Sequence, residues 1–386
     1  MVDKNITDFD IQPDLDTVLI KVASRCNINC SYCYVYHMGD DNWSQMEKLI
    51  SLETMDAVCN SLKELSQSQN KCFSIVLHGG EPLLLGAFKL DYFLCILRNA
   101  LPESYPISIQ TNGILITREI LDICSKYKAS IAVSIDGPKF VHDKSRVTHK
   151  GEGTFEEVIK GIHELESHAD SIFLYSGLLA VIDPQSDPVD VYSFFKELAP
   201  PSIDFLYRDG NHTNLPAGKS SVNSTEYGVW MAGLLDAYLD DETPIPIRVL
   251  DDMLKVLLGG IVSKEGLGLT DFGIIIIDTD GTITKNDTLK SSYNRADRFE
   301  SKLNIKDGNL LNFLTTDEFQ LYREMQRPTS LKCIKCPMLN VCGGGMTLHR
   351  WRKENGFNNP SVFCADQLFL IDRMQEKLVQ FGVTHE

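Results

Sequence analysis

Short apolar runs alternate with longer amphipathic segments through the first half of the chain. The runs are rich in β-branched residues and are bounded by polar residues or glycine, which is typical of buried strands, whereas the segments between them have helical spacing. The sequence predicts strands at 18–23, 73–77, 107–110, 129–135, 172–181 and 203–207, and helices at 54–65, 87–100, 118–127, 154–166 and 189–198. Strands that alternate with helices of this length form βα units around a parallel sheet.

The alternation stops near residue 216. Two helices are predicted at 225–240 and 247–258, followed by a β-hairpin at 272–283 with Asp280-Gly281 as its turn. The stretch 209–224 is rich in Gly, Asn, Pro and Ser, which favours a boundary there. The predicted division is a tail at 1–15, an α/β domain at 16–215, a bridging region with the hairpin at 216–327, and a C-terminal domain at 328–386.

Composition excludes several classes of protein. The chain has 386 residues, of which 43% are hydrophobic, and a formal net charge of −16. This charge argues against a nucleic-acid partner. No apolar run is long enough to cross a bilayer, and the N-terminus has no signal-peptide core, so we expect a cytoplasmic protein without a membrane partner. Eleven cysteines in such a protein indicate metal binding or catalysis rather than disulfides.

Three cysteines follow the first predicted strand directly. Cys26, Cys30 and Cys33 lie within eight residues, on the loop that leaves the strand. Three close thiolates suit a thiophilic metal centre. A cubic four-iron cluster held by three cysteines keeps one iron without a protein ligand, where a substrate can bind.

This loop, C-x3-C-x2-C with Tyr32 before the third cysteine, resembles the radical SAM superfamily. The resemblance implies that S-adenosylmethionine chelates the open iron through its amino and carboxylate groups. It also implies that the reduced cluster cleaves this molecule into methionine and a 5′-deoxyadenosyl radical. The implied fold is α/β, a partial, open (β/α)6 barrel; six predicted units agree with it and are too few for a complete barrel. A chance cluster of buried cysteines, or a zinc site, is the alternative.

Glycine and polar residues follow the second, third and fourth predicted strands, where parallel α/β folds bind ligands. The stretch 79–82, Gly-Gly-Glu-Pro, resembles the family motif that binds the methionyl amino group, with Glu81 as acceptor. The resemblance implies a SAM site made of Gly79, Gly80, Glu81, Thr111, Asn112, Ser134, Asp136 and Arg146. The alternative for each is an ordinary residue of a βα turn.

A second set of cysteines lies near the C-terminus, at Cys333, Cys336, Cys342 and Cys364. Four thiols can ligate one cluster completely. The order C-x2-C-x5-C-x21-C resembles the auxiliary-cluster part of the SPASM domain of peptide and protein maturases. The implied cofactors are therefore S-adenosylmethionine and two [4Fe-4S] clusters. A structural zinc site, which also takes four cysteines, is the alternative for the second set.

A full SPASM domain holds a second auxiliary cluster, whose cysteines lie before the hairpin, after it, and four residues past Cys342. Here Asn286 and Met346 stand at two of these places, and 267–290 contains no cysteine. We therefore expect one auxiliary cluster only. The remaining cysteines, each alone in a strand or helix pattern, are predicted to be core residues: Cys59, Cys72, Cys95 and Cys124.

Asp287 follows the hairpin and aligns with an aspartate that is a candidate proton acceptor in sulfatase-maturing relatives. A carboxylate near the reacting carbon could take the proton that oxidation releases. The alternative is a solvated acidic residue in a turn.

The stretch 34–36, with Asp40, Trp43 and the stretch 78–84, resembles maturases of the Xye, Fxs and Grr peptide systems, which install cyclophane crosslinks. The resemblance implies abstraction of a β-hydrogen from a ribosomally made precursor peptide, followed by a C–C bond to an aromatic ring. A flavodoxin- or ferredoxin-type reductant is implied. The residues before the first strand are too few for a fused recognition domain, so the leader would bind the barrel, the bridging region or a separate protein.

Other reactions stay open on the same scaffold. They are thioether formation, epimerisation and formylglycine formation in a sulfatase. The alternative from a different functional class is a non-catalytic iron–sulfur or zinc protein. Such a protein would not cleave S-adenosylmethionine.

Overall fold

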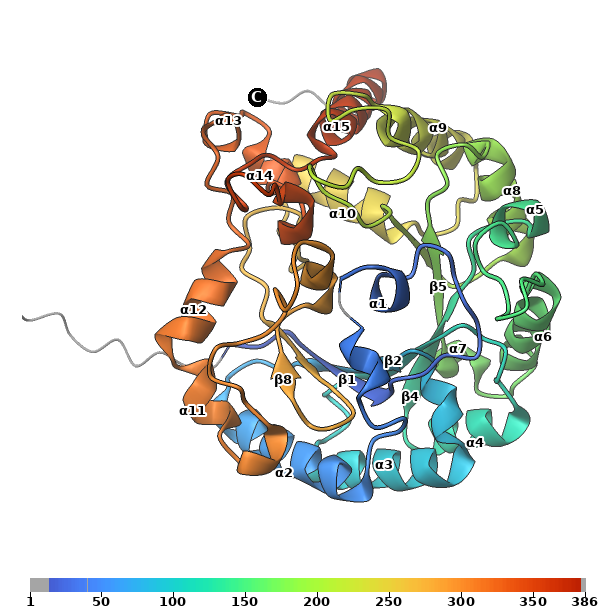
Figure 1. The fold of residues 1–386 in the computed structure, drawn as a ribbon. Helices are drawn as coiled ribbons and strands as arrows, with labels where there is room; N and C mark the ends of the chain where they lie inside the picture. Colours follow the sequence, from blue (N-terminus) through green and yellow to red (C-terminus); the bar gives the residue numbers. More distant parts are fainter. Residues whose placement is uncertain (1–13, 40, 383–386) are drawn as a thin grey trace, which may run out of the picture.

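The computed structural model describes residues 14–39 and 41–382. Most of the tail predicted at 1–15, and Asp40, therefore lie outside the described residues. The chain winds once around an open sheet, with its helices on the outside of the ring and the loop that follows the first strand near the centre (Figure 1).

Six parallel strands form the main part of the sheet, as the pattern of apolar runs predicts. They are β1 (Thr17–Ala23), β2 (Ser74–Gly79), β3 (Ile107–Thr111), β4 (Ala129–Ser134), β5 (Tyr175–Val181) and β6 (Ile203–Leu206). The spatial order is β6-β5-β4-β3-β2-β1-β7-β8, so the end strands do not pair and the ring stays open. The prediction of a partial barrel is confirmed.

The helices of the βα units cover the outer face of this sheet (Figure 1). They are α2 (Leu52–Ser68), α3 (Ala87–Ala100), α4 (Arg118–Lys126), α6 (Phe155–Glu166) and α8 (Pro188–Leu198). Each lies within about three residues of its predicted bounds. One strand differs: residues 171–174 form a helical turn, α7 (Ser171–Leu174), so β5 begins later than predicted. Ile172 and Phe173 are apolar but exposed, which explains why the pattern extended the strand.

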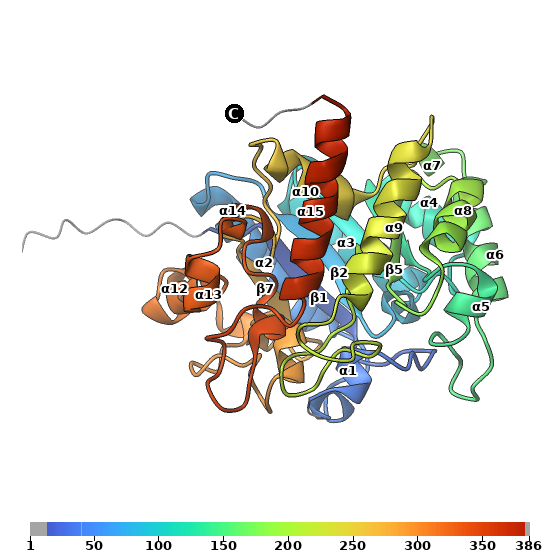
Figure 2. The ribbon, with the colours of Figure 1, turned by 90° about the horizontal axis from the view of Figure 1, so that it is seen from above.

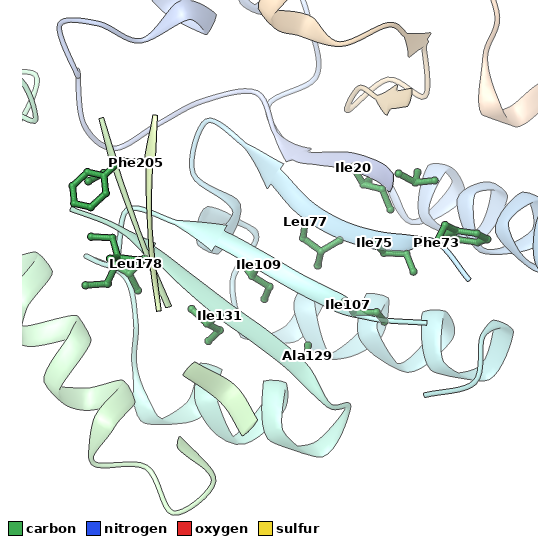
Figure 3. Close-up of a cluster of buried hydrophobic side chains, with 14 of the residues drawn as sticks. Ile20, Phe73, Ile75, Leu77, Ile107, Ile109, Ala129, Ile131, Leu178 and Phe205 are labelled. Carbon is green, nitrogen blue, oxygen red and sulfur yellow. The ribbon is translucent and has the colours of Figure 1, made fainter. Parts of the chain in front are cut away.

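The core lies between the sheet and these helices. Figure 3 shows alternate residues of neighbouring strands, such as Ile75, Leu77 and Ile109, on one face; all three are fully buried. The other face of the strands looks into the ring and carries polar side chains, including His78 and Gln110, which are half-buried. One face of each strand therefore stabilises the fold, while the other is free to form a site.

The predicted hairpin is part of the barrel sheet. Its strands are β7 (Ile274–Ile277) and β8 (Ile283–Thr284), and β7 pairs in parallel with β1 over Thr17–Ile20. Four consecutive isoleucines suit a strand that is covered on both sides. The bridging region at 216–327 therefore shares the sheet of the barrel, and the domain division stays a prediction.

The rest of the chain is mainly helical. The long helices are α9 (Glu226–Asp240), α10 (Arg248–Leu257) and α15 (Cys364–Gln380), of which α9 and α15 lie side by side (Figure 2). Shorter helices are α1 (Tyr34–His37), α5 (Lys139–His142), α11 (Leu310–Leu314), α12 (Asp317–Glu324), α13 (Leu331–Ile334) and α14 (Leu339–Cys342). Single 3₁₀ turns are η1 (Asn42–Ser44), η2 (Pro82–Leu85), η3 (Asp287–Ser291), η4 (Ile305–Asp307) and η5 (Thr347–Arg350). No helix among the described residues has the length and apolar character needed to span a bilayer.

The lone cysteines do not all behave as predicted. Cys59 and Cys124 are buried and Cys95 is half-buried, as small apolar core residues would be. Cys72 is exposed, so its assignment to the core is wrong. It precedes β2 in a polar connection, where the apolar run that follows begins only at Phe73.

A fully buried ion pair anchors the last helix. Lys219 Nζ lies 2.5 Å from Asp366 Oδ2, and neither side chain is exposed. The other oxygen of Asp366 accepts a hydrogen bond from the backbone N–H of Gly228 in α9, at 2.9 Å. The pair therefore joins α9, α15 and the segment between β6 and α9.

Replacing Lys219 by methionine is expected to lower the free energy of unfolding by about 3 kcal/mol, because the Asp366 carboxylate stays buried without its cation. Denaturant unfolding of the purified chain measures the change. Lys160→Met, at an exposed position of α6, is the control and is expected to change stability by less than about 0.5 kcal/mol. A similar, small effect for both variants would contradict the prediction.

Candidate active site

The loop with the first three cysteines is held over the open end of the ring. The backbone N–H of Asn29 donates to Val147 O at 2.7 Å, and that of Ser31 donates to Ser145 O at 2.9 Å. Burial raises the pKa of the Cys26 thiol to about 12 and that of Cys30 to about 11. Buried thiols of this kind keep their protons unless a positive centre compensates the thiolate charge.

All three thiols face one cavity of about 330 Å³. Its wall also includes residues from the ends of β2, β3, β4 and β6, and residues from the C-terminal part of the chain. Of the residues predicted to bind S-adenosylmethionine, six line this cavity: Gly79, Gly80, Thr111, Asn112, Ser134 and Arg146. The structure therefore brings the first three cysteines and most of the predicted SAM site together.

Glu81 is buried and is not among the residues that line the cavity. Its side chain is 0% exposed, and both carboxylate oxygens accept hydrogen bonds from this chain. Thr111 Oγ1 donates to Oε1 at 2.6 Å, and the backbone N–H of Asn112 donates to Oε2 at 2.8 Å. In this structure the carboxylate fixes the turn after β3, and its direct contact with the methionyl amino group stays a prediction.

Asp136 is also buried and does not line the cavity itself, but it holds two residues that do. Its Oδ1 lies 3.0 Å from Arg146 Nε, and its Oδ2 accepts a hydrogen bond from the Tyr32 hydroxyl at 2.6 Å. The Arg146 guanidinium lies 5.6 Å from the centre of the Tyr32 ring. Asp136 thus positions the cation that borders the cavity and the aromatic residue of the cysteine loop.

Asn112 connects the turn after β3 with the cysteine loop. Its side-chain N–H group donates to Asn27 Oδ1 at 2.7 Å and contacts Cys26 Sγ at 3.8 Å. Ser134 accepts a hydrogen bond from Gln110 at 2.9 Å. Trp43 packs its ring edge-on against Tyr36 with the centroids 4.8 Å apart.

Asp287 is buried in a charged network that the sequence analysis did not find. Its Oδ2 lies 2.8 Å from Lys21 Nζ, which also contacts Asp278 Oδ1 at 3.1 Å. The Tyr34 hydroxyl donates to Asp287 Oδ1 at 3.0 Å. Burial alone would raise the pKa of Asp287, but Lys21 holds it below its ordinary value. Asp287 is therefore not the solvated turn residue of the alternative reading.

The charge in the first strand was a signal for this network. Lys21 stands inside the apolar run of β1 and is 5% exposed. A buried lysine requires a carboxylate partner. The identity of the partner was not readable, because Asp278 and Asp287 come from the hairpin region more than 250 residues away.

The four C-terminal cysteines surround a second, smaller cavity. Burial raises the pKa of Cys342 to about 11, and the neighbouring thiols of Cys333, Cys336 and Cys364 oppose its ionisation further. Gly343, Gly344 and Gly345 all have positive φ angles, of 59°, 81° and 69°. A Cβ at Gly343 would lie 2.1 Å from Gly268 O, so only glycine permits this turn around Cys342.

The positions that would hold a second auxiliary cluster are occupied by hydrogen-bonded and packed side chains instead. The Asn286 side-chain amide donates to Glu265 Oε2 at 2.5 Å. Met346 packs directly on Gly266, where an added Cβ would come within 2.9 Å of the Met346 side chain. Burial raises the pKa of Glu265.

The two cavities share part of their walls. Cys342 and Gln367 line both the cavity of the first three cysteines and the cavity of the four C-terminal cysteines. Glu265, Gly266 and Met346 also line the larger one. A group in the larger cavity therefore lies between the two sets of thiols.

The donor sets fit iron–sulfur clusters and S-adenosylmethionine. The three thiols of the first loop lie on one cavity and the four C-terminal thiols surround the other, with Cys342 on the wall of both. When deprotonated by a metal, both sets supply the soft thiolate ligands that iron–sulfur clusters require. The larger cavity also exposes glycine backbone, polar side chains and the Arg146 cation, which suit the amino, carboxylate and ribose groups of S-adenosylmethionine.

Comparisons with known proteins agree with this geometry. The sequence model of the radical SAM superfamily matches residues 20–181. A cysteine-type anaerobic sulfatase-maturating enzyme of Clostridium perfringens is 23% identical over 91% of this chain and 94% of its own length. The radical SAM cyclopropyl synthase TigE of Paramaledivibacter caminithermalis is 26% identical over 88% of this chain and 70% of its own length.

The fold has a solved counterpart. The structure of native anSMEcpe with bound AdoMet and Cp18Cys peptide superposes with a TM-score of 0.80 at 21% identity, covering 96% of this chain and 99% of that one. The cofactors that follow from the superfamily are S-adenosylmethionine and [4Fe-4S] clusters. Residues 20–181 therefore carry a radical SAM domain, which lies on the partial barrel from β1 to β5.

Proposed function

We propose that the chain is a maturase that oxidises a residue of a peptide or protein segment held between the two sets of cysteines. The observation that carries this proposal is the cavity of about 330 Å³ that reaches from Cys26, Cys30 and Cys33 to Cys342. The solved complex of anSMEcpe with the Cp18Cys peptide supports a peptide as substrate.

When bound, S-adenosylmethionine and its cluster supply a 5′-deoxyadenosyl radical that removes a hydrogen atom from the substrate. Cys26, Cys30 and Cys33 would hold that cluster. Arg146, fixed by Asp136, would bind the cofactor carboxylate, and the backbone at Gly79 and Gly80 admits its methionyl part. Apolar residues of the cavity wall would limit the access of water to the radical: Val181, Phe205, Val249, Met253 and Leu267.

The four C-terminal cysteines would hold one auxiliary cluster, within a domain at 328–386. The Glu265–Asn286 hydrogen bond and the packing of Met346 support a single auxiliary cluster. Because Cys342 borders the substrate cavity, a one-electron acceptor there would lie beside the substrate.

The product that we favour is a C–C cyclophane crosslink in a ribosomally made precursor peptide. A single auxiliary cluster and the local resemblance at 34–43 and 78–84 support it. Formylglycine formation in a sulfatase is the second candidate, supported by the likeness to the Clostridium perfringens enzyme. Both need a strong reductant of the flavodoxin or ferredoxin type, and the crosslinking reaction could use a separate leader-binding protein.

Mass spectrometry of the products separates the two candidates. The reconstituted enzyme is incubated with S-adenosylmethionine, a reductant and either a short peptide encoded beside its gene or a sulfatase peptide that contains cysteine or serine. We expect the first peptide to lose two hydrogens and to give a fragment-resistant ring that does not react with an aldehyde probe. An aldehyde on the sulfatase peptide, with no change in the first, would support formylglycine formation instead. An unchanged mass with inverted stereochemistry would support epimerisation.

A further inference from the structure

One carboxylate on the wall of the larger cavity has no partner. Asp209 lies three residues beyond β6 and lines the cavity with Tyr207 and Arg208. Nothing in residues 14–39 and 41–382 donates a hydrogen bond to its carboxylate or forms an ion pair with it. The neighbouring Arg208 is directed elsewhere: its Nε donates to Ile182 O at 3.2 Å and its guanidinium lies over the Tyr32 ring. Asp209 is half-buried, and removing a carboxylate from water without giving it a partner is costly, which favours a functional reason for it.

Asp209 lies close to the buried network around Asp287. Asn211, two residues further along the chain, donates a hydrogen bond to Ser291 O at 3.0 Å and so joins the segment after β6 to η3. The charge of Asp209 acts on Tyr34, whose hydroxyl donates to Asp287. The two carboxylates are therefore near each other, with only Asp209 on the cavity wall.

The environments of these two carboxylates differ in kind. Both oxygens of Asp287 are occupied, one by Lys21 and the other by Tyr34, and its side chain is 2% exposed. Asp287 is not among the residues that line the cavity. Asp209 faces the cavity with both oxygens free of protein donors. A base must come within hydrogen-bond reach of the proton that it removes. Of these two carboxylates, only Asp209 lines the cavity in which the substrate would lie.

We propose that Asp209, rather than Asp287, is the carboxylate that accepts the proton when the substrate radical is oxidised. This inference rests on the proposed function but does not depend on which product forms. Asp287, paired with Lys21, is then a positioning residue that holds Tyr34 and the charge of the site.

The step balances in atoms and electrons. In a crosslinked ring the bond that breaks is an aryl C–H bond, and in a cysteine radical it is the S–H bond. The proton moves to a carboxylate oxygen of Asp209. The electron pair of that bond and the unpaired electron make three electrons, of which two form the π bond of the product. The third would pass to a one-electron acceptor, the iron–sulfur cluster that the four C-terminal cysteines would hold.

The protonation of Asp209 agrees with this role. Burial, together with the nearby charge of Asp287, raises the pKa of Asp209 to about 7. A base whose pKa is close to the working pH combines a high ionised fraction with a strong affinity for the proton. The titratable groups that act on it are Asp287 from η3 and Tyr34 from α1, with Arg208 beside it in the chain. The carboxylate form is lost as the pH falls through about 7. The amount of product formed per 5′-deoxyadenosine should therefore also fall as the pH is lowered through this range.

The test compares Asp209→Asn with Asp372→Asn, a matched change at an exposed position of α15. In Asp209→Asn we expect 5′-deoxyadenosine to form at nearly the normal rate, while product per 5′-deoxyadenosine falls by about 100-fold or more. Peptide affinity, measured by fluorescence anisotropy without reductant, should not change. Normal product yield, or a loss explained entirely by weaker peptide binding, would overturn the proposal.

A second readout does not depend on turnover. Infrared difference spectroscopy of the oxidised protein should show a carboxyl C=O band that disappears with a midpoint near pH 7 and is missing from Asp209→Asn. A titration of Asp209 in the ordinary range of aspartate, near 4, would overturn the proposal whether or not a substrate is known. If the wild type makes no product from either peptide, the proposed function fails, and this titration still decides the inference about Asp209.

Discussion

Replacing Cys26, Cys30 and Cys33 together by alanine is expected to abolish the cleavage of S-adenosylmethionine and to remove about four of about eight irons per chain. The reason is that these three thiols face the cavity that also contains the predicted SAM site, whereas the four C-terminal thiols surround a separate cavity. Iron and sulfide analysis after anaerobic reconstitution, with assay of 5′-deoxyadenosine, measures both effects.

The matched control replaces Cys59 and Cys124 by alanine. Both are buried in helices and line neither cavity. This variant should keep about eight irons and normal cleavage. About twelve irons in the wild type would contradict the single auxiliary cluster and would move the function toward sulfatase maturation or thioether formation. About four irons with one zinc would make the C-terminal site structural and remove the proposed electron acceptor.

The Lys21→Met variant is expected to lose about 5 kcal/mol of unfolding free energy. The change leaves the carboxylates of Asp278 and Asp287, which are 1% and 2% exposed, without the ammonium group that they share. Breaking one buried ion pair costs about 3–5 kcal/mol, and this change breaks two such contacts at once. Denaturant unfolding of the wild type and the variant measures the loss.

The triple variant Lys21→Met, Asp278→Asn, Asp287→Asn should recover part of the lost stability, because no uncompensated charge stays buried. Lys63→Met, on the exposed side of α2, is the control and should change stability by less than about 0.5 kcal/mol. A loss below about 1 kcal/mol in Lys21→Met would mean that water or protonation compensates the two carboxylates. The network would then contribute little to the free energy of unfolding.

Local sequence patterns were sufficient to predict the strands and helices of the barrel. Runs such as Ile107–Thr111 and caps such as Ser51, whose hydroxyl accepts the N–H of Thr54, depend on neighbours in the sequence. The predicted SAM residues also follow strands in order, so that a parallel sheet brings them to one edge. These features are encoded within single βα units, and the structure brings six of the eight predicted SAM residues to one cavity.

Features that depend on distant contacts could not be predicted. The hairpin was expected in a bridging region, but only the tertiary structure reveals that β7 extends the sheet beside β1. Likewise, Asp209 was only the first residue of the polar stretch 209–224 in the sequence, because its lack of a partner is visible only once the cavity is formed. Glu81 was expected at the ligand, yet the folded turn encloses its carboxylate in hydrogen bonds from Thr111 and Asn112.

The pairing of β1 with β7 has a consequence for synthesis of the chain. Thr17–Ile20 must wait for Ile274–Ile277, which leaves the ribosome more than 250 residues later, on the order of tens of seconds at typical translation rates. Until then, one edge of β1 exposes unpaired backbone N–H and C=O groups, which is the kind of surface that pairs with other nascent chains. A fragment that ends at residue 215 would keep this edge permanently, so such a fragment is expected to associate through it.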